Sequence, residues 1–72
     1  MTYIEVKRPL ATLEFELVYY RDEIILNICA YGDWWEEAFK SEEDLNEYLK
    51  SKYKLDDENI RKLKEHAERI NR

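Results

Sequence analysis

Hydrophobic and polar residues alternate through the first half of the chain, which is the pattern of strands that bury one face. The alternation is clearest in residues 11–20 (ATLEFELVYY), where one side carries Leu13, Phe15, Leu17 and Tyr19. Residues 2–6 (TYIEV) alternate in the same way. Pro9 separates the two stretches, because proline lacks the backbone donor that a strand interior uses. The sequence therefore predicts two strands, one on each side of Pro9.

A third alternating stretch, residues 23–31 (EIILNICAY), is apolar on both sides. Its first side carries Ile24, Leu26, Ile28 and Ala30, and its second side carries Ile25, Cys29 and Tyr31 around Asn27. A strand of this kind is usually central in its sheet or covered on both faces. Residues 21–22 (RD) are the expected turn between the second and third strands.

The second half of the chain has the spacing of helices. Ser41 and Asp44 form an S-x-x-D capping box, and apolar residues follow at helical intervals: Leu45, Tyr48, Leu49 and Tyr53. Asp56 is the expected N-cap of a last helix, whose apolar stripe would contain Ile60, Leu63, Ala67 and Ile70. This helix would reach the basic end of the chain, with Arg69 and Arg72 in its last turns. Opposite charges four residues apart would support it: Glu58–Lys62, Arg61–Glu65, Lys64–Glu68 and Glu65–Arg69.

Residues 34–40 (WWEEAFK) fit two different structures. If residues 32–33 (GD) are a tight turn, this segment is a fourth strand. Trp35 and Phe39 would then share one face of that strand, and Trp34 and Ala38 would share the other. If Asp33 instead caps a helix, one helix would run over residues 34–53. The pattern favours the strand, because residues 40–44 would leave more than one helical turn without an apolar side chain.

Together these elements predict one α+β domain over residues 1–72, an antiparallel β-meander of three to four strands with two C-terminal helices packed on one face. The face under the helices is expected to carry the larger apolar side chains of the strands. These are Ile4, Val6, Leu13, Phe15, Leu17, Ile24, Leu26, Ile28, Trp35 and Phe39.

The opposite face of the predicted sheet is too apolar for a surface covered only by water. Exposed patches rich in Trp and Tyr mark protein interfaces. We therefore predict a protein interface, beside Cys29, that consists of Tyr3, Val18, Tyr20, Ile25, Tyr31, Trp34, Glu36 and Glu37. The competing interpretation is that sheet twist and the stems of long charged side chains cover these residues.

The net charge of −5 is concentrated in one segment. Residues 33–49 carry seven acids and one lysine, whereas the rest of the chain carries eleven bases and ten acids. The helix macrodipole accounts for the acids of residues 42–44, which begin a predicted helix. It does not account for Asp33, Glu36 and Glu37, which precede that helix.

No arrangement of residues points to catalysis, to a cofactor or to a metal. His66 and Cys29 are the only residues of their types and lie on different predicted elements, so the N and S ligands of a zinc site are too few. Gly32 is the only glycine, which excludes a glycine-rich phosphate loop. Direct nucleic-acid binding is not expected, because residues 50–54 hold just three lysines beside the acidic segment.

Three functions remain open from the sequence. The first is a non-enzymatic interaction module that forms a homodimer through the aromatic sheet face or an edge strand. The second is an acidic inhibitor, of the type common among phage and mobile-element products, that docks on a basic site of a nucleic-acid-handling protein. The third is a small enzyme or ligand binder with an unrecognised pocket. The single cysteine and the lack of a signal peptide or an apolar span predict a cytoplasmic protein without a membrane segment.

Overall fold

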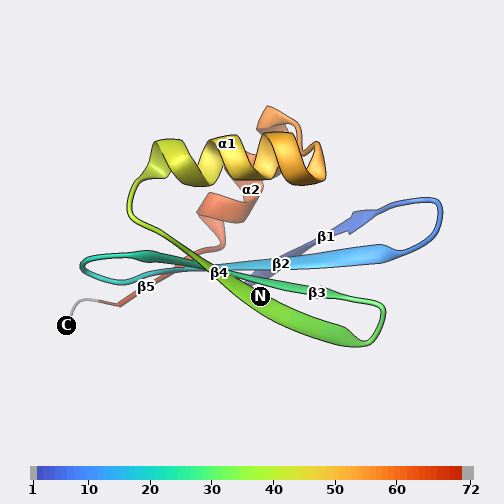
Figure 1. Ribbon diagram of the computed structural model, residues 1–72, viewed down its shortest axis with the longest axis horizontal. Coiled ribbons are helices and arrows are strands. Elements are labelled where there is room, and N and C mark those ends of the chain that lie inside the picture. Colours follow the sequence, from blue (N-terminus) through green and yellow to red (C-terminus); the bar gives the residue numbers. More distant parts are fainter. Residues whose placement is uncertain (1, 71–72) are drawn as a thin grey trace.

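The computed structural model describes residues 2–70, which form a meander, two helices and a short last strand (Figure 1). The meander is antiparallel and consists, in chain order, of β1 (Tyr3–Lys7), β2 (Thr12–Tyr19), β3 (Ile24–Ala30) and β4 (Asp33–Phe39). It is followed by α1 (Glu42–Tyr53), α2 (Asp57–Glu65) and β5 (Glu68–Arg69). The predicted α+β fold is confirmed, and the meander has four strands.

The fourth strand exists because the turn before it suits a two-residue hairpin. Tyr31 and Gly32 both have positive φ, 56° and 74°, as the central residues of a type I′ turn require. This turn matches the right-handed twist of the strands, so β4 returns along β3 with Trp35 opposite Ile28. The alternative of one helix over residues 34–53 is therefore wrong.

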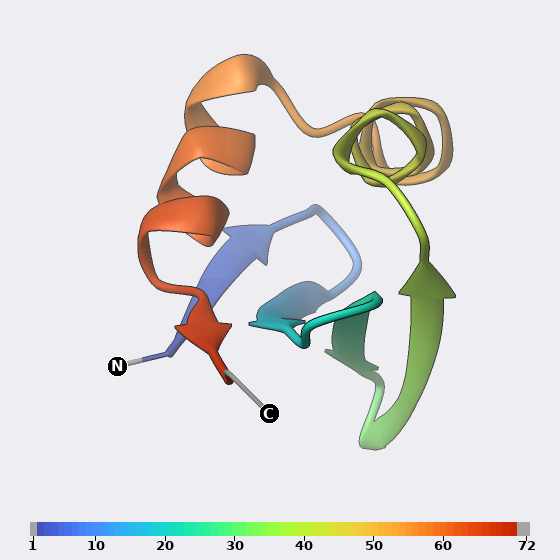
Figure 2. The same ribbon diagram turned by 90° about the vertical axis from the view of Figure 1, so that its left-hand side faces the viewer.

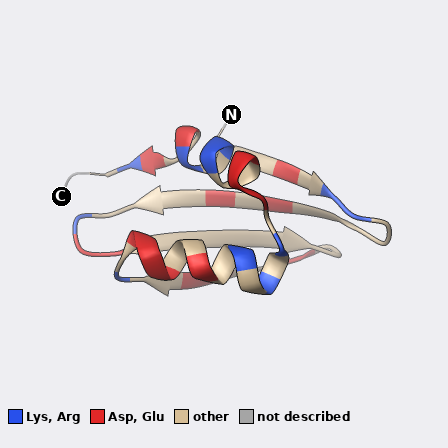
Figure 3. Ribbon diagram, turned by 90° about the horizontal axis from the view of Figure 1, so that it is seen from above, with Lys and Arg blue, Asp and Glu red and all other residues tan. Residues whose placement is uncertain are grey.

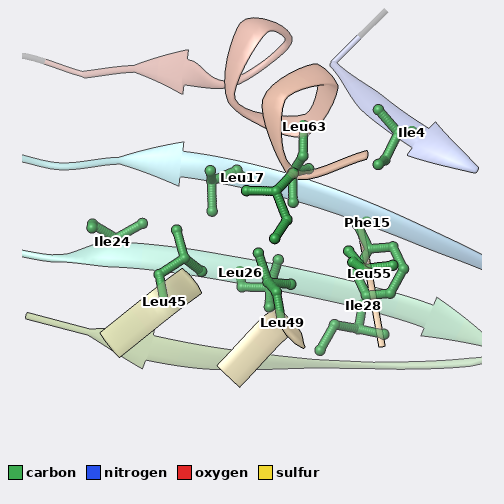
Figure 4. Close-up of a cluster of buried hydrophobic side chains, with 11 residues drawn as sticks. Ile4, Phe15, Leu17, Ile24, Leu26, Ile28, Leu45, Leu49, Leu55 and Leu63 are labelled. Atoms are coloured by element: carbon green, nitrogen blue, oxygen red, sulfur yellow. The ribbon is translucent and has the colours of Figure 1, made fainter. Parts of the chain in front are cut away.

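Both helices cover the same face of the sheet, α1 on the side of β4 and α2 on the side of β1 and β2 (Figure 2). Apolar side chains from the sheet and from the helices meet between the two layers (Figure 4). The largest fully buried ones are Phe15, Leu17, Leu26, Ile28, Leu45, Leu49 and Leu63. Trp35 and Phe39 are partly buried and pack against this core, on the face where the sequence predicts them.

Side-chain caps begin both helices at the predicted residues. Ser41 Oγ accepts a hydrogen bond from the backbone N–H of Asp44 at 3.1 Å, and Asp56 Oδ1 accepts one from the N–H of Asn59 at 2.8 Å. Each cap satisfies a donor of the first turn that has no partner within the helix. Arg8, in the turn after β1, donates from its guanidinium to the carbonyl of Tyr53 at the end of α1. The helix layer is thereby tied to the sheet at that end of α1.

The prediction of a last helix that continues to the end of the chain is wrong. The helix α2 ends at Glu65, and the next residues form β5, which pairs in parallel with β2 at Val18 and Tyr19. The pairing is possible because β1 begins opposite Glu16. The last residues of β2 therefore have β3 on one side and no part of β1 on the other. The N–H of Ile70 then donates to the carbonyl of Tyr19 at 2.8 Å.

This change of structure also replaces the charge pairs predicted for the end of the helix. Arg69 lies over the ring of Tyr19, with 4.3 Å from its Cζ atom to the ring centroid, and does not face Glu65 across a helical turn. Lys64 pairs with Glu42 of α1 at 2.9 Å. Arg61 and Glu65 do form the predicted pair. Arg72 lies outside the described residues.

Candidate protein-interaction surface

One face of the sheet has no helix over it (Figure 2), and we call it the outer face. Strand alternation and register place on it, from the four strands of the meander, Tyr3, Glu5, Lys7, Thr12, Glu14, Glu16, Val18, Ile25, Asn27, Cys29, Trp34, Glu36 and Ala38. Glu68 of β5 lies beside Val18 on the same face. Two rows of cross-strand neighbours make up its centre. The first row is Tyr3, Glu16, Asn27 and Glu36, and the second is Glu5, Glu14, Cys29 and Trp34.

Four of the predicted interface residues lie on the outer face and are accessible. Tyr3 and Ile25 are half-buried, Glu36 is exposed, and Trp34 is 66% exposed. The two tryptophans are separated as predicted, because Trp35 points to the helices and packs against the core. Trp34 therefore has no role in the core and is available to a partner.

Val18 is on the outer face but is only 6% exposed, so its inclusion in the predicted interface is wrong. The strand β5 pairs beside it, with Glu68 as its neighbour. The sequence interpretation placed residues 68–70 in a helix and therefore left this edge of β2 open. The apolar area of the outer face is smaller than predicted as a result.

Glu37, also predicted to be in the interface, lies between Trp35 and Phe39 on the face that the helices cover. It is exposed there, since β4 is an edge strand. Burial, the neighbouring Tyr53 hydroxyl and the charge of Glu37 together raise the pKa of Tyr48 to about 12. A charged side chain on the inner side of an edge strand is a known device against strand-to-strand aggregation.

The remaining two predicted residues lie just beyond the strands. Tyr20 follows β2 and is exposed at one end of the sheet. Tyr31 is in the turn between β3 and β4 at the other end, and it is 78% exposed. Tyr31 and Trp34 are therefore two exposed aromatic residues at the same end of the β3–β4 hairpin, whereas Tyr20 lies at the other end of the sheet.

The predicted interface left out three acids that the structure places on the same face. Glu5, Glu14 and Glu16 join Glu36 there, so the outer face of the meander carries four carboxylates and one lysine, Lys7. Glu5 lies directly opposite Glu14, and like charges in this position destabilise a sheet. Within residues 2–70, none of the four carboxylates has a salt bridge to Lys or Arg. The alternation of acids in residues 12–16 was the signal that could have revealed two of them.

Between the two central rows the outer face is hollowed, with a volume of about 490 Å³. Glu14, Glu16 and Glu36 line the hollow, together with Tyr3, Asn27, Cys29 and Trp34. Glu16 accepts hydrogen bonds from Thr2 Oγ1 at 2.7 Å and from Asn27 Nδ2 at 3.1 Å. The Oδ1 atom of Asn27 is buried and has no donor among the described residues. The charged side chains that line the hollow are thus all carboxylates.

Several charged groups on the helix side form ion pairs with one another. The first turn of α1 is acidic and its last turn basic (Figure 3), as the macrodipole favours. Glu42 pairs with Lys64. Burial raises the pKa of Glu42, but contacts with Tyr19 and Lys64 and the charges of Lys64 and Arg69 outweigh it, so its pKa is below the ordinary value. Burial, and then the nearby Glu42, raise the pKa of Tyr19.

Comparison of the chain with protein-family models, with curated proteins and with solved structures finds no match. None of the helices in residues 2–70 has the length and apolar character needed to cross a membrane. Over the same residues, no group of three or more His, Cys, Asp or Glu side chains is placed to hold a metal ion. The outer face is therefore the candidate site on which a functional proposal can rest.

Proposed function

We propose that this protein is a non-catalytic binding module that docks its outer face on a basic surface of a partner protein. The observation that carries the proposal is the composition of that face: four carboxylates of the meander, without salt bridges among the described residues, share it with an exposed tryptophan. Charge complementarity of this kind gives specificity and fast association. Trp34 and Tyr31 supply the aromatic side chains that contribute most to binding energy in interfaces.

The same charges argue against a homodimer through this face. Two copies joined there would bring the acidic side chains of both copies together, with one lysine from each. Burying like charges without partners costs several kcal/mol, and the burial of Val18 removes apolar area that would offset this cost. A foreign basic partner is therefore favoured over the self-association that the sequence suggested.

A class of partner follows from the required charge. Clustered Lys and Arg are typical of surfaces that bind nucleic acid. A nucleic acid itself would be repelled by the outer face, because both are negative. We therefore infer that the partner is a nucleic-acid-handling protein, and that docking on its basic site makes this chain an acidic inhibitor of it.

The test compares two double charge reversals that change the net charge equally. Glu14→Lys with Glu36→Lys alters the outer face, and Glu43→Lys with Glu47→Lys alters the exposed side of α1. Binding of each variant to a nona-arginine peptide is measured by calorimetry from about 0.1 to 0.5 M salt. Because the matched variants share one net charge, any difference in affinity between them reports the face that is used.

We expect the outer-face variant to lose at least about tenfold in affinity and the α1 variant less than about threefold. Equal losses would mean that only net charge matters, and the proposal would be wrong. Sedimentation of the wild type provides the other decisive result. A dimer that persists at 0.5 M salt and blocks peptide binding would overturn the proposal in favour of self-association.

A further inference from the structure

We infer that the hollow of the outer face is a receptor for one arginine side chain of the partner. This inference rests on the proposed function and specifies how the basic partner is recognised. The hollow lies between the row of Glu16, Asn27 and Glu36 and the row of Glu14, Cys29 and Trp34. Strands lie about 4.8 Å apart, and residues two apart in a strand are separated by about 7 Å. The hollow is open to solvent, so a planar cation can reach the carboxylates and Trp34 together.

The charged groups of the hollow favour a ligand that donates hydrogen bonds. Glu14, Glu16 and Glu36 are acceptors when ionised. One of the two amide N–H donors of Asn27 is used by Glu16, and its Oδ1 has no donor among the described residues. This oxygen is covered in the free protein, so a ligand reaches it only if the side chains above it move. A guanidinium has five donors and no acceptor, and therefore complements this set of groups.

The aromatic residues of the hollow favour arginine over lysine. Trp34 is largely exposed at one side of the hollow and Tyr3 lies at another. A guanidinium stacks on an aromatic face while it pairs with carboxylates in two-pronged fashion, which an ammonium cannot do. In residues 2–70, the guanidinium that lies over an aromatic ring is that of Arg69, over Tyr19. The ring of Trp34 is therefore free to receive a cation from outside.

An arginine receptor also gives a reason for the unfavourable placement of two glutamates opposite each other in the sheet. Glu5 and Glu14 face each other across β1 and β2, and repulsion between them weakens the sheet. A bound guanidinium beside Glu14 would relieve this repulsion. Arginine at millimolar concentration should therefore raise the melting temperature of the wild type, and more than lysine at the same concentration does.

The inference is tested by NMR titration with three pentapeptides, Gly-Gly-X-Gly-Gly, blocked at both ends. X is arginine, lysine or citrulline, the last being a neutral analogue of arginine. Weak binding is sufficient, because shifts of the Trp34 indole N–H and the Asn27 side-chain amide report the hollow directly. We expect saturable shifts with the arginine peptide, affinity at least about fivefold lower with the lysine peptide, and no saturable shift with citrulline.

The control uses two adjacent glutamates on opposite faces of β4. Glu36→Gln should weaken binding of the arginine peptide at least about fivefold, whereas Glu37→Gln should change it less than about twofold. The two variants lose the same charge, and both residues are exposed on an edge strand, so both should remain folded. Amide spectra with native dispersion verify that each variant is folded.

Equal affinity for the arginine and lysine peptides would overturn the inference of an arginine receptor. Equal losses of affinity in the Glu36→Gln and Glu37→Gln variants would also overturn it. The proposed function would still stand if the nona-arginine peptide loses affinity with the outer-face reversal alone. If the outer-face and α1 reversals lose equal affinity for the nona-arginine peptide, the proposed function fails too, whatever the arginine pentapeptide shows. The two experiments therefore separate the failure of one proposal from the failure of the other.

Discussion

The adjacent residues Trp34 and Trp35 have different environments, because neighbouring side chains of a strand point to opposite faces. Trp35 is partly buried against the core beneath the helices. Trp34 is 66% exposed on the outer face, among carboxylates. One of these residues therefore stabilises the fold, and the other belongs to the surface on which the proposed function rests.

Alanine substitutions should separate these two roles. Trp35→Ala removes a large side chain from the core and is expected to lower the free energy of unfolding by about 3 kcal/mol. Trp34→Ala should lower it by less than about 0.5 kcal/mol, as is usual for surface positions. Urea titration of both variants measures the difference. Equal losses would show that both faces of β4 are enclosed, and the outer face would then not be a free surface.

Tyr31 is held in an unfavourable backbone conformation. Its φ of 56° is uncommon for a bulky residue, and the first central position of a type I′ turn prefers Asn, Asp or Gly. The side chain is 78% exposed, so core packing does not compensate for the strain. Strain retained at an exposed aromatic residue is consistent with a role in binding.

Tyr31→Asn should therefore stabilise the protein, by about 0.5–1 kcal/mol in thermal or urea unfolding. The same variant should bind the nona-arginine peptide no better than the wild type does. A loss of stability would mean that the Tyr31 ring makes stabilising contacts in solution, and its assignment to the binding tip would be wrong.

At the level of elements, β4 is the edge strand that most requires protection from pairing with another chain. It has seven residues, pairs only with β3 and carries Glu37 on the face of Trp35 and Phe39. A charge in this position prevents a second strand from extending the apolar inner face. We therefore expect Glu37, which the sequence interpretation assigned to an interface, to hinder pairing of β4 with another strand.

Glu37→Val tests this role. The substitution extends an apolar stripe along β4 and should cause concentration-dependent association, which sedimentation velocity detects at micromolar concentrations. Glu36→Val is the matched control on the outer face and should cause less association, because the carboxylates there remain. If Glu37→Val stays monomeric at every concentration, the edge is protected by other means.

At the level of the whole molecule, one polar cluster joins four elements of the fold. Tyr19 of β2, Glu42 of α1, Lys64 of α2 and Arg69 of β5 lie together. The Tyr19 hydroxyl is buried without a hydrogen bond of good geometry among the described residues, although Glu42 is close enough to perturb it. The cluster holds the helix layer to the end of the sheet where β5 completes β2.

The stability that Glu42 contributes should depend on pH. Its pKa is lower in the folded protein than the ordinary value of 4.5, so its contribution is complete above pH 4.5 and disappears as the pH falls through the folded-state pKa. The carboxylate is half-exposed, which limits the effect to about 0.5 kcal/mol. Glu42→Gln should therefore be less stable than the wild type at pH 7, and the difference should shrink towards pH 3. A difference that is the same at both pH values would contradict this role.

Short-range pattern was enough to predict much of the fold. Alternation identified the strands, Ser41 and Asp56 marked the starts of both helices, and side-chain parity separated Trp34 from Trp35. These features depend on residues a few positions apart, whose relative directions are set by the backbone geometry of a strand or a helix. The same parity also placed Tyr3, Ile25 and Glu36 on the outer face.

The remaining features depended on contacts between distant parts of the chain. Residues 66–70 have a helical pattern, yet β5 forms because β1 leaves the edge of Val18 and Tyr19 open, and unpaired strand edges gain by hydrogen bonding. The same pairing buries Val18. The acidic outer face required the register of four strands, since Glu5, Glu14, Glu16 and Glu36 are scattered in the sequence and meet only in the sheet. The sequence of a short segment favours a strand or a helix. Which side chains of that segment stay exposed depends on the other elements that pack or pair with it.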